Sequence, residues 1–221
     1  MLRFSTLITI ALFSAGDASF AQDDQAEARA ARAGRRPVLP PAEEVALARS
    51  AAPRSISANA RVLALTDTGY AIIAEGSSRV TCVVNRSWDK SVEPHCYDPE
   101  GAATVMPIEL RRNHLRHIGK SEDEISRELA LGLAAGKYRL PSRPALTYMM
   151  SARQVLYDDS GKYVGRWRPH LMIYFPNLSN EAMALPAVPD MRIGMVGGEG
   201  RMESSLIIVM SAFADVTSRG R

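Results

Sequence analysis

The order in which hydrophobic patterns follow one another is the strongest constraint on how this chain can fold. Short runs typical of strands come first, two helical segments follow, and further strand-like runs close the sequence. Helices and strands do not alternate as they do in a doubly wound parallel sheet, and no glycine-rich phosphate loop is present. The sequence therefore predicts an α+β fold: a mainly antiparallel sheet with two central helices, in a single domain with one disulfide.

Three strand-like runs open the folded region, over 62–65, 70–74 and 80–84. Turn residues separate them, at 67–69 and 76–78, which favours an antiparallel meander. The next stretch, 85–101, is rich in proline, histidine and charged residues, and we expect it to be irregular. Later strands are predicted over 145–150, 154–157, 163–167, 170–175 and 204–210.

Two helices are predicted in the middle of the chain. The first covers 106–118 and ends at Gly119. The second begins after Ser121, which forms a capping box with Glu124, and it ends near Gly136. Shorter helices are predicted over 43–51 and 179–184.

Residues 1–21 have the parts of a secretory signal peptide. Arg3 supplies the positive charge, 7–13 form a short apolar run, and Ser19 and Ala21 are the small residues that precede a cleavage site. The apolar run is shorter than the roughly 20 residues that a membrane-spanning helix needs, and no later run reaches that length. We expect cleavage before Gln22 and a soluble, periplasmic or secreted product without a transmembrane segment.

Composition divides the remainder of the chain. Residues 22–42 contain almost no large apolar side chain and are predicted to be a flexible linker. A single α+β domain is expected over 43–214, followed by a frayed polar tail over 215–221. The chain as a whole is 46% hydrophobic and 23% charged, which is typical of a globular protein.

The chain has only two cysteines, Cys82 and Cys96. In an oxidising compartment an isolated pair usually forms a disulfide, and closing a loop of about 15 residues stabilises a fold by about 3 kcal/mol. The alternative is a pair of reduced or metal-bound thiols.

The net charge of +3 is a weak argument for an anionic envelope surface or polyanion, because a genome that favours arginine codons explains it better. The folded region shows no basic face with interleaved aromatic residues, so nucleic acid is not expected as a partner.

His95 lies in the segment EPHCYDPEG, beside Cys96 and close to Asp98 and Glu100. An imidazole and two carboxylates on a disulfide-anchored loop can form a metal site or an acid–base pair. The competing interpretation is a tight turn over 98–101, with His95 capping it.

His170 opens a strongly apolar strand, and Trp167 and Tyr174 can form the walls of a pocket around it. If that strand lies beside Cys96, His95 and His170 converge, and with Asp98 or Glu100 they would form a zinc site. The competing interpretation is a histidine at the edge of the core, hydrogen-bonded to the backbone. The sequence indicates no nucleophile motif and no cofactor, and it assigns no catalytic residue.

Three segments carry a resemblance: EPHCYDPEGAATVMPIELR, GKSEDEISRELALGLAAGKYRLPSRPALTYMMS and GRWRPHLMIYFPNLSN. Together they resemble a family of small secreted bacterial proteins with no assigned function, over about Glu43 to Ala212. The resemblance implies an export signal and a single domain. It implies no activity, cofactor or catalytic residue.

The sequence leaves three functional hypotheses. The first is a non-catalytic binding or envelope-associated protein, whose pocket for a small molecule or an envelope component is lined by Tyr148, Trp167 and Tyr174. The second is a metal-dependent hydrolase that uses His95 and His170 with Asp98 or Glu100. The third is a structural role in which the arginine-containing arm, 22–42, tethers the domain to anionic envelope polymers.

Overall fold

A computed structural model describes residues 38–86, 91–158, 160–186, 192, 194–199 and 203–216. The predicted signal peptide, most of the predicted linker and residues 217–221 lie outside this part of the chain. The helices are α2 (Pro41–Arg49), α3 (Arg54–Ser57), α4 (Pro99–Ala103), α5 (Val105–His117) and α6 (Glu122–Ala134). The strands are β1 (Arg61–Thr66), β2 (Gly69–Ala74), β3 (Thr81–Arg86), β4 (Ser91–Tyr97), β5 (Ala145–Met149), β6 (Val155–Tyr157), β7 (Tyr163–Gly165), β8 (His170–Tyr174), β9 (Met195–Gly197) and β10 (Ser205–Val209).

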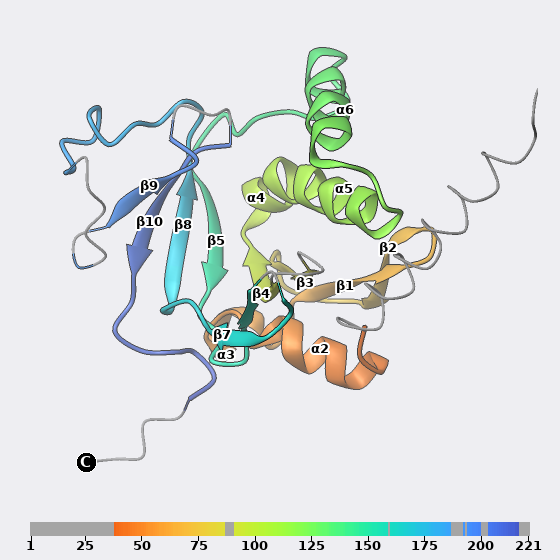
Figure 1. The fold of residues 1–221 in the computed structure, drawn as a ribbon. Coiled ribbons are helices and arrows are strands. Elements are labelled where there is room, and N and C mark those ends of the chain that lie inside the picture. The colour runs from red at the N-terminus through yellow and green to blue at the C-terminus, as the bar shows by residue number, and fades with distance from the viewer. Residues whose placement is uncertain are drawn as a thin grey trace, which may run out of the picture.

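The strands form one mixed sheet in the order β2-β1-β3-β4-β5-β8-β10-β9, and β6 and β7 branch from β4 as a hairpin. Among the pairs of described strands, only β1 and β3 run parallel. Helix α2 covers one face of β1 to β4, and α4 and α5 cover the other (Figure 1). The predicted α+β class, single domain and mainly antiparallel sheet are confirmed.

The predicted meander of the first three strands is wrong, because β3 pairs with β1 and not with β2. The chain leaves β2 and passes beneath the start of β1, where Ser78 N–H donates to the Asn59 carbonyl at 3.0 Å. Gly76 makes this crossing feasible, because a Cβ there would lie 2.3 Å from the Arg61 backbone nitrogen. Burial explains the order: every residue of β3 is buried, whereas β2 lies at the edge and leaves Ile72 48% exposed.

The stretch over 85–101, predicted to be irregular, contains strand β4 and helix α4. The sequence pattern does not indicate a strand here, because proline rarely lies within a central strand and Pro94 is in the middle of β4. Here β4 pairs with β6 at Ser91 and Val92 and with β5 at Cys96 and Tyr97. Between these pairings the edge of β4 that faces β5 has no partner strand among the described residues, so the missing N–H of Pro94 is tolerated.

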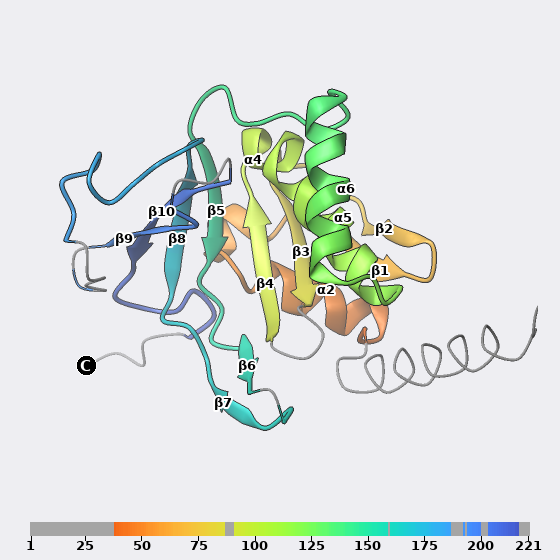
Figure 2. The same ribbon diagram turned by 45° about the horizontal axis from the view of Figure 1, so that its top comes forward.

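The middle helices agree closely with the sequence pattern. Ser121 Oγ accepts from the Glu124 N–H at 3.3 Å, and Glu124 Oε2 accepts from the Ser121 N–H at 2.9 Å, which is the predicted capping box (Figure 2 shows the helix that it opens). Ile125 and Leu129 bury the apolar side of α6 against α5. The short helix predicted over 179–184 is instead a series of turns, in which Ala184 has a φ of 52°.

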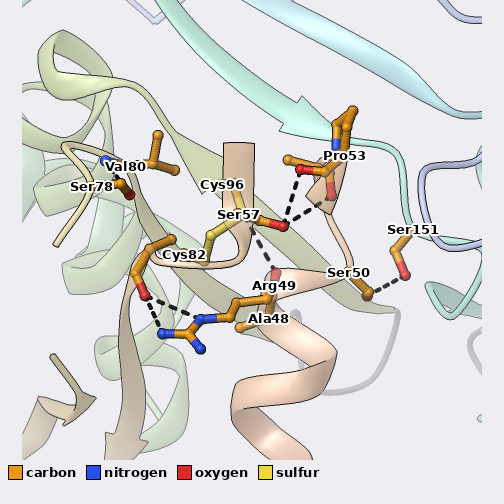
Figure 3. Close-up of a disulfide and its surroundings, with 12 residues drawn as sticks. Ala48, Arg49, Ser50, Pro53, Ser57, Ser78, Val80, Cys82, Cys96 and Ser151 are labelled. Carbon is orange, nitrogen blue, oxygen red and sulfur yellow. Dashed lines mark hydrogen bonds between the residues drawn. A yellow bond between two sulfur atoms is a disulfide. The ribbon is translucent and has the colours of Figure 1, made fainter. Parts of the chain in front are cut away.

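The disulfide between Cys82 and Cys96 is confirmed. The two residues are direct partners in the register of β3 and β4, and both are fully buried on the α2 face (Figure 3). Glu44 of α2 is also fully buried and binds Arg86 at the end of β3 through two hydrogen bonds of 2.6 Å. The α2 face is therefore held by a covalent bond and a bidentate ion pair.

Candidate functional site

The candidate site lies where β4 separates from β5. Glu93 and His95 lie on the free edge of β4 around Pro94, and their side chains share the α5 face with Tyr97. Met149 of β5 and His170 of β8 lie opposite them. Both side chains are buried, and the two residues are direct register partners. A cavity of about 350 Å³ lies between the two sides. We call it the junction pocket.

The junction pocket has a mixed lining of polar and apolar side chains. Its polar or ionisable lining residues are Glu93, His95, Glu109 and His170, and its apolar and aromatic ones are Met149, Trp167, Met172, Tyr174, Met195 and Ile207. A wider groove of about 800 Å³ between α5, α6 and β10 shares Glu109, Met172, Tyr174 and Ile207 with it. The two cavities are therefore neighbours.

His95 is buried and is oriented from behind by a hydrogen-bonded network. Its Nδ1 lies 2.8 Å from Asn85 Nδ2 and 3.0 Å from the Tyr97 hydroxyl. Asn85 Oδ1 accepts from Asn113 of α5 at 3.1 Å, which assigns the Asn85 amide nitrogen as a donor to His95. Nδ1 is then an acceptor, so the ring proton resides on Nε2.

That Nε2–H has no hydrogen-bond partner among the described residues, although it is fully buried. The nearest carboxylate oxygen, Glu93 Oε2, is 4.0 Å away, which is too far for a hydrogen bond. Burial, followed by the nearby His170, lowers the pKa of His95 to about 3. His95 is therefore a neutral donor at physiological pH, and its side chain lines the junction pocket.

His170 is held in the opposite tautomer. Its Nδ1–H donates to the Arg168 carbonyl at 2.7 Å, so Nε2 carries the lone pair. Burial lowers the pKa of His170 as well, partly offset by the hydrogen bond to Arg168. The pocket thus contains one imidazole that donates and one that accepts.

Glu93 and Trp167 bridge the two sides at the mouth of the pocket. The indole N–H of Trp167 donates to Glu93 Oε1 at 2.9 Å. Burial raises the pKa of Glu93, and the hydrogen bond from Trp167 opposes this shift. Trp167 remains 46% exposed, so its ring forms the outer wall of the pocket.

Glu109 lies on α5 at the boundary between the pocket and the groove. It forms an ion pair with Arg112, which also binds Glu203 at 2.8 Å. Burial lowers the pKa of Arg112, but these two carboxylates outweigh it and raise that pKa above its usual value. The charge of Glu109 is therefore largely compensated by protein groups.

Asp98 and Glu100 do not line the pocket, because both stabilise helix α4 and the start of β5. Asp98 Oδ1 accepts from the Gly101 N–H at 2.7 Å and from the Leu146 N–H at 3.1 Å. Glu100 accepts from the Ser142 N–H at 3.2 Å and from Arg143 at 3.1 Å. The Ser142 N–H is the main cause of the lowered pKa of Glu100.

The structure thus brings together four of the six residues selected from the sequence: His95, Trp167, His170 and Tyr174. Tyr148, also considered as a pocket residue, packs on the opposite face beside the disulfide. In the described ranges, no three His, Cys, Asp or Glu side chains are grouped closely enough to hold a metal ion.

Sequence reasoning missed Glu93, Glu109 and the methionines at 149 and 195 as lining residues. The signal for Glu93 was available: had 91–97 been interpreted as a strand, its alternation would have put Glu93 and His95 on the same face. Glu109 and the methionines have no comparable local signal.

Comparison of the chain with protein-family models, with curated proteins and with solved structures finds no match. No helix in the part of the chain that the structure describes is long and apolar enough to cross a membrane.

Proposed function

We propose that this chain is an exported, non-catalytic binding protein that holds a small, mostly apolar, uncharged ligand in the junction pocket. The observation that carries the proposal is the Nε2–H of His95, which is buried and without a partner among the described residues, on a side chain that lines a mainly apolar cavity. A buried donor without a partner costs about 1–3 kcal/mol, and a ligand carbonyl or ether oxygen would recover that free energy.

The lining favours an adaptable binding site. About 350 Å³ is within the usual range for small-molecule pockets, roughly 300–1,000 Å³. Met149, Met172 and Met195 have flexible thioether side chains that adjust to irregular ligands. Both imidazoles are neutral at physiological pH, since burial lowers their pKa values, so a charged ligand gains little from them.

The proposed location is the periplasm or the exterior of the cell. Residues 1–21 have the pattern of a signal peptide, and a disulfide of this kind persists in oxidising compartments.

The first experiment blocks the pocket. Ile207 lines it, whereas Ile208, the next residue of β10, faces the other way and is 37% exposed. We expect Ile207→Trp to abolish the fluorescence enhancement of the neutral probe N-phenyl-1-naphthylamine, and the control Ile208→Trp to preserve it. Equal probe affinity in Ile207→Trp and the wild type would contradict the proposal, provided that both variants melt cooperatively.

A matched pair of ligands tests the role of His95. Acetophenone and ethylbenzene have similar size, but only the ketone has an acceptor oxygen. We expect the wild type to prefer acetophenone by about tenfold, the equivalent of one hydrogen bond of about 1.4 kcal/mol, and His95→Leu, whose side chain has no donor, to lose this preference while still melting cooperatively. An unchanged preference in the variant would show that Nε2–H does not contact the ligand.

A metal-dependent hydrolase is the second candidate, because His95 and His170 line the same pocket as the carboxylate of Glu93. Asp98 and Glu100 are bound elsewhere, so Glu93 is the carboxylate in place to act as a base. Elemental analysis of untagged protein separates the candidates. Near-stoichiometric zinc or iron, whose removal by a chelator lowers the melting temperature, would favour the hydrolase over the binding protein.

A further inference from the structure

A second cavity lies on the other side of the molecule, between α2, α3 and the segment 211–216 that runs past them. It has a volume of about 780 Å³, and four arginines line it: Arg49, Arg54, Arg153 and Arg166. Its one acidic lining residue is Asp215. We call this cavity the arginine cleft.

The charge of Asp215 is already engaged by protein donors. Its Oδ1 accepts from the Ala152 N–H at 2.7 Å, and its Oδ2 accepts from the Ser151 hydroxyl at 3.0 Å. No ion pair joins Asp215 to any of the four arginines in the described residues. With four arginines and one aspartate, the lining of the cleft has a formal charge of about +3.

Two of the guanidinium groups are positioned by neutral acceptors. Arg49 donates to the Ala60 carbonyl from Nε at 3.1 Å and from Nη2 at 2.6 Å, in the region drawn in Figure 3. Arg166 donates to the Ala152 carbonyl, and its guanidinium lies 5.8 Å from the centroid of the Phe213 ring. A carbonyl or a ring fixes a guanidinium without cancelling its charge.

The other arginines of the fold behave differently. Seven of them form ion pairs with glutamates: Arg61, Arg86, Arg111, Arg112, Arg116, Arg139 and Arg143. Holding four like charges around one cavity is unfavourable unless an anion compensates them. Four arginines without a glutamate partner therefore line one cavity, in which a ligand has room to bind.

We propose that the arginine cleft binds an anion that carries at least two phosphate groups. Guanidinium pairs in a bidentate way with either phosphate or carboxylate oxygens. A phosphate group is favoured because its three terminal oxygens can face two guanidinium groups at once, which a carboxylate can do less well. Four guanidinium groups therefore match two phosphates. This site is separate from the junction pocket and does not depend on it.

The test uses Arg54 and Arg153, which are exposed and for whose side chains the described residues show no hydrogen bond or ion pair. Arg54→Gln with Arg153→Gln removes two cleft charges. The matched control, Arg79→Gln with Arg127→Gln, removes two exposed arginines from outside the cleft. Calorimetric titration of the full chain with pyrophosphate and tripolyphosphate, at constant ionic strength, compares the three proteins.

We expect wild-type protein to bind both polyphosphates, the cleft variant to bind them about 100-fold more weakly, and the control to change by less than about threefold. Equal losses in the two variants would overturn the proposal, because they would indicate diffuse charge attraction. Citrate binding as tight as tripolyphosphate would also overturn it, since the site would then not select phosphate.

Phosphate groups can also come from a lipid surface. Vesicles of phosphatidylcholine with and without phosphatidylglycerol distinguish this source from a soluble one. Cleft-dependent binding to the anionic vesicles, with no binding of the soluble polyphosphates, would assign the site to clustered lipid phosphates. Binding of neither source would overturn the proposal.

Discussion

The two halves of the sheet are built in different ways. The first half, β2-β1-β3-β4, has helices on both faces, and every residue of β3 is buried. The second half, β5-β8-β10-β9, extends beyond the helices in both ribbon views and leaves Ile208 and Phe175 exposed. The first half also holds the disulfide and the buried ion pair. The comparison teaches that the half covered by helices is held by the strongest bonds. The junction pocket forms where the strands of the two halves, β4 and β5, separate.

The first prediction concerns the buried ion pair between Glu44 and Arg86 in the first half of the sheet. Glu44→Ala should lower the free energy of unfolding by about 3–5 kcal/mol, because Arg86 would remain buried without its counter-charge. The neighbouring exposed residue gives a control, Glu43→Ala, which should stay within about 0.5 kcal/mol of the wild type. Urea denaturation measures both, and similar losses in the two variants would contradict the assignment.

The second prediction concerns the disulfide. Replacing Cys82 and Cys96 together by alanine should lower the free energy of unfolding by about 3 kcal/mol. Dithiothreitol should destabilise the wild type but leave the double variant unchanged. The junction pocket should still bind its probe, because both cysteines face α2; loss of probe binding in a folded variant would show that the two halves are less independent than the structure indicates.

The third prediction concerns how the stability of the fold depends on pH through His95, which lies at the boundary between the two halves. The pKa of His95 is about 3 in the folded protein and about 6.5 in the unfolded chain, so the unfolded state binds more protons between these values. Stability is therefore complete above pH 6.5 and falls as the pH is lowered. The expected loss from His95 is about 2 kcal/mol between pH 6.5 and pH 5, at about 1.4 kcal/mol per pH unit.

His170 contributes in the same direction, since burial lowers its pKa too. In His95→Gln the slope of unfolding free energy against pH should decrease over this interval, while a glutamine oxygen can still accept from Asn85. An unchanged slope would mean that His95 does not titrate on unfolding as the structure requires.

Local chemistry made several features predictable from the sequence. The capping box at Ser121 and the disulfide depend on residues that are close in the chain. The position of β3 was not predictable, because a turn signal gives a reversal of the chain but not the side on which the next strand pairs. Strand β4 was missed because Pro94 is tolerated only through a gap in pairing that no local pattern reveals.

Part of the candidate site was predictable, because His170 opens the apolar strand β8. His95 and His170 line one pocket, although β5 separates their strands and β8 does not lie beside Cys96, which was the condition of the convergence hypothesis. Asp98 and Glu100 are near His95 in sequence but are used locally, as a helix cap and as an ion-pair partner. Glu93 and Glu109 reach the pocket through tertiary packing, which sequence proximity does not report.

The hydrogen bond from Trp167 to Glu93 joins positions that are 74 residues apart. Contacts of such separation require a long loop to close, so they tend to form late in folding. Cys82 and Cys96 are only 14 positions apart and can meet much earlier. The loop closed by the contact between Trp167 and Glu93 therefore costs more conformational entropy than the loop closed by the disulfide.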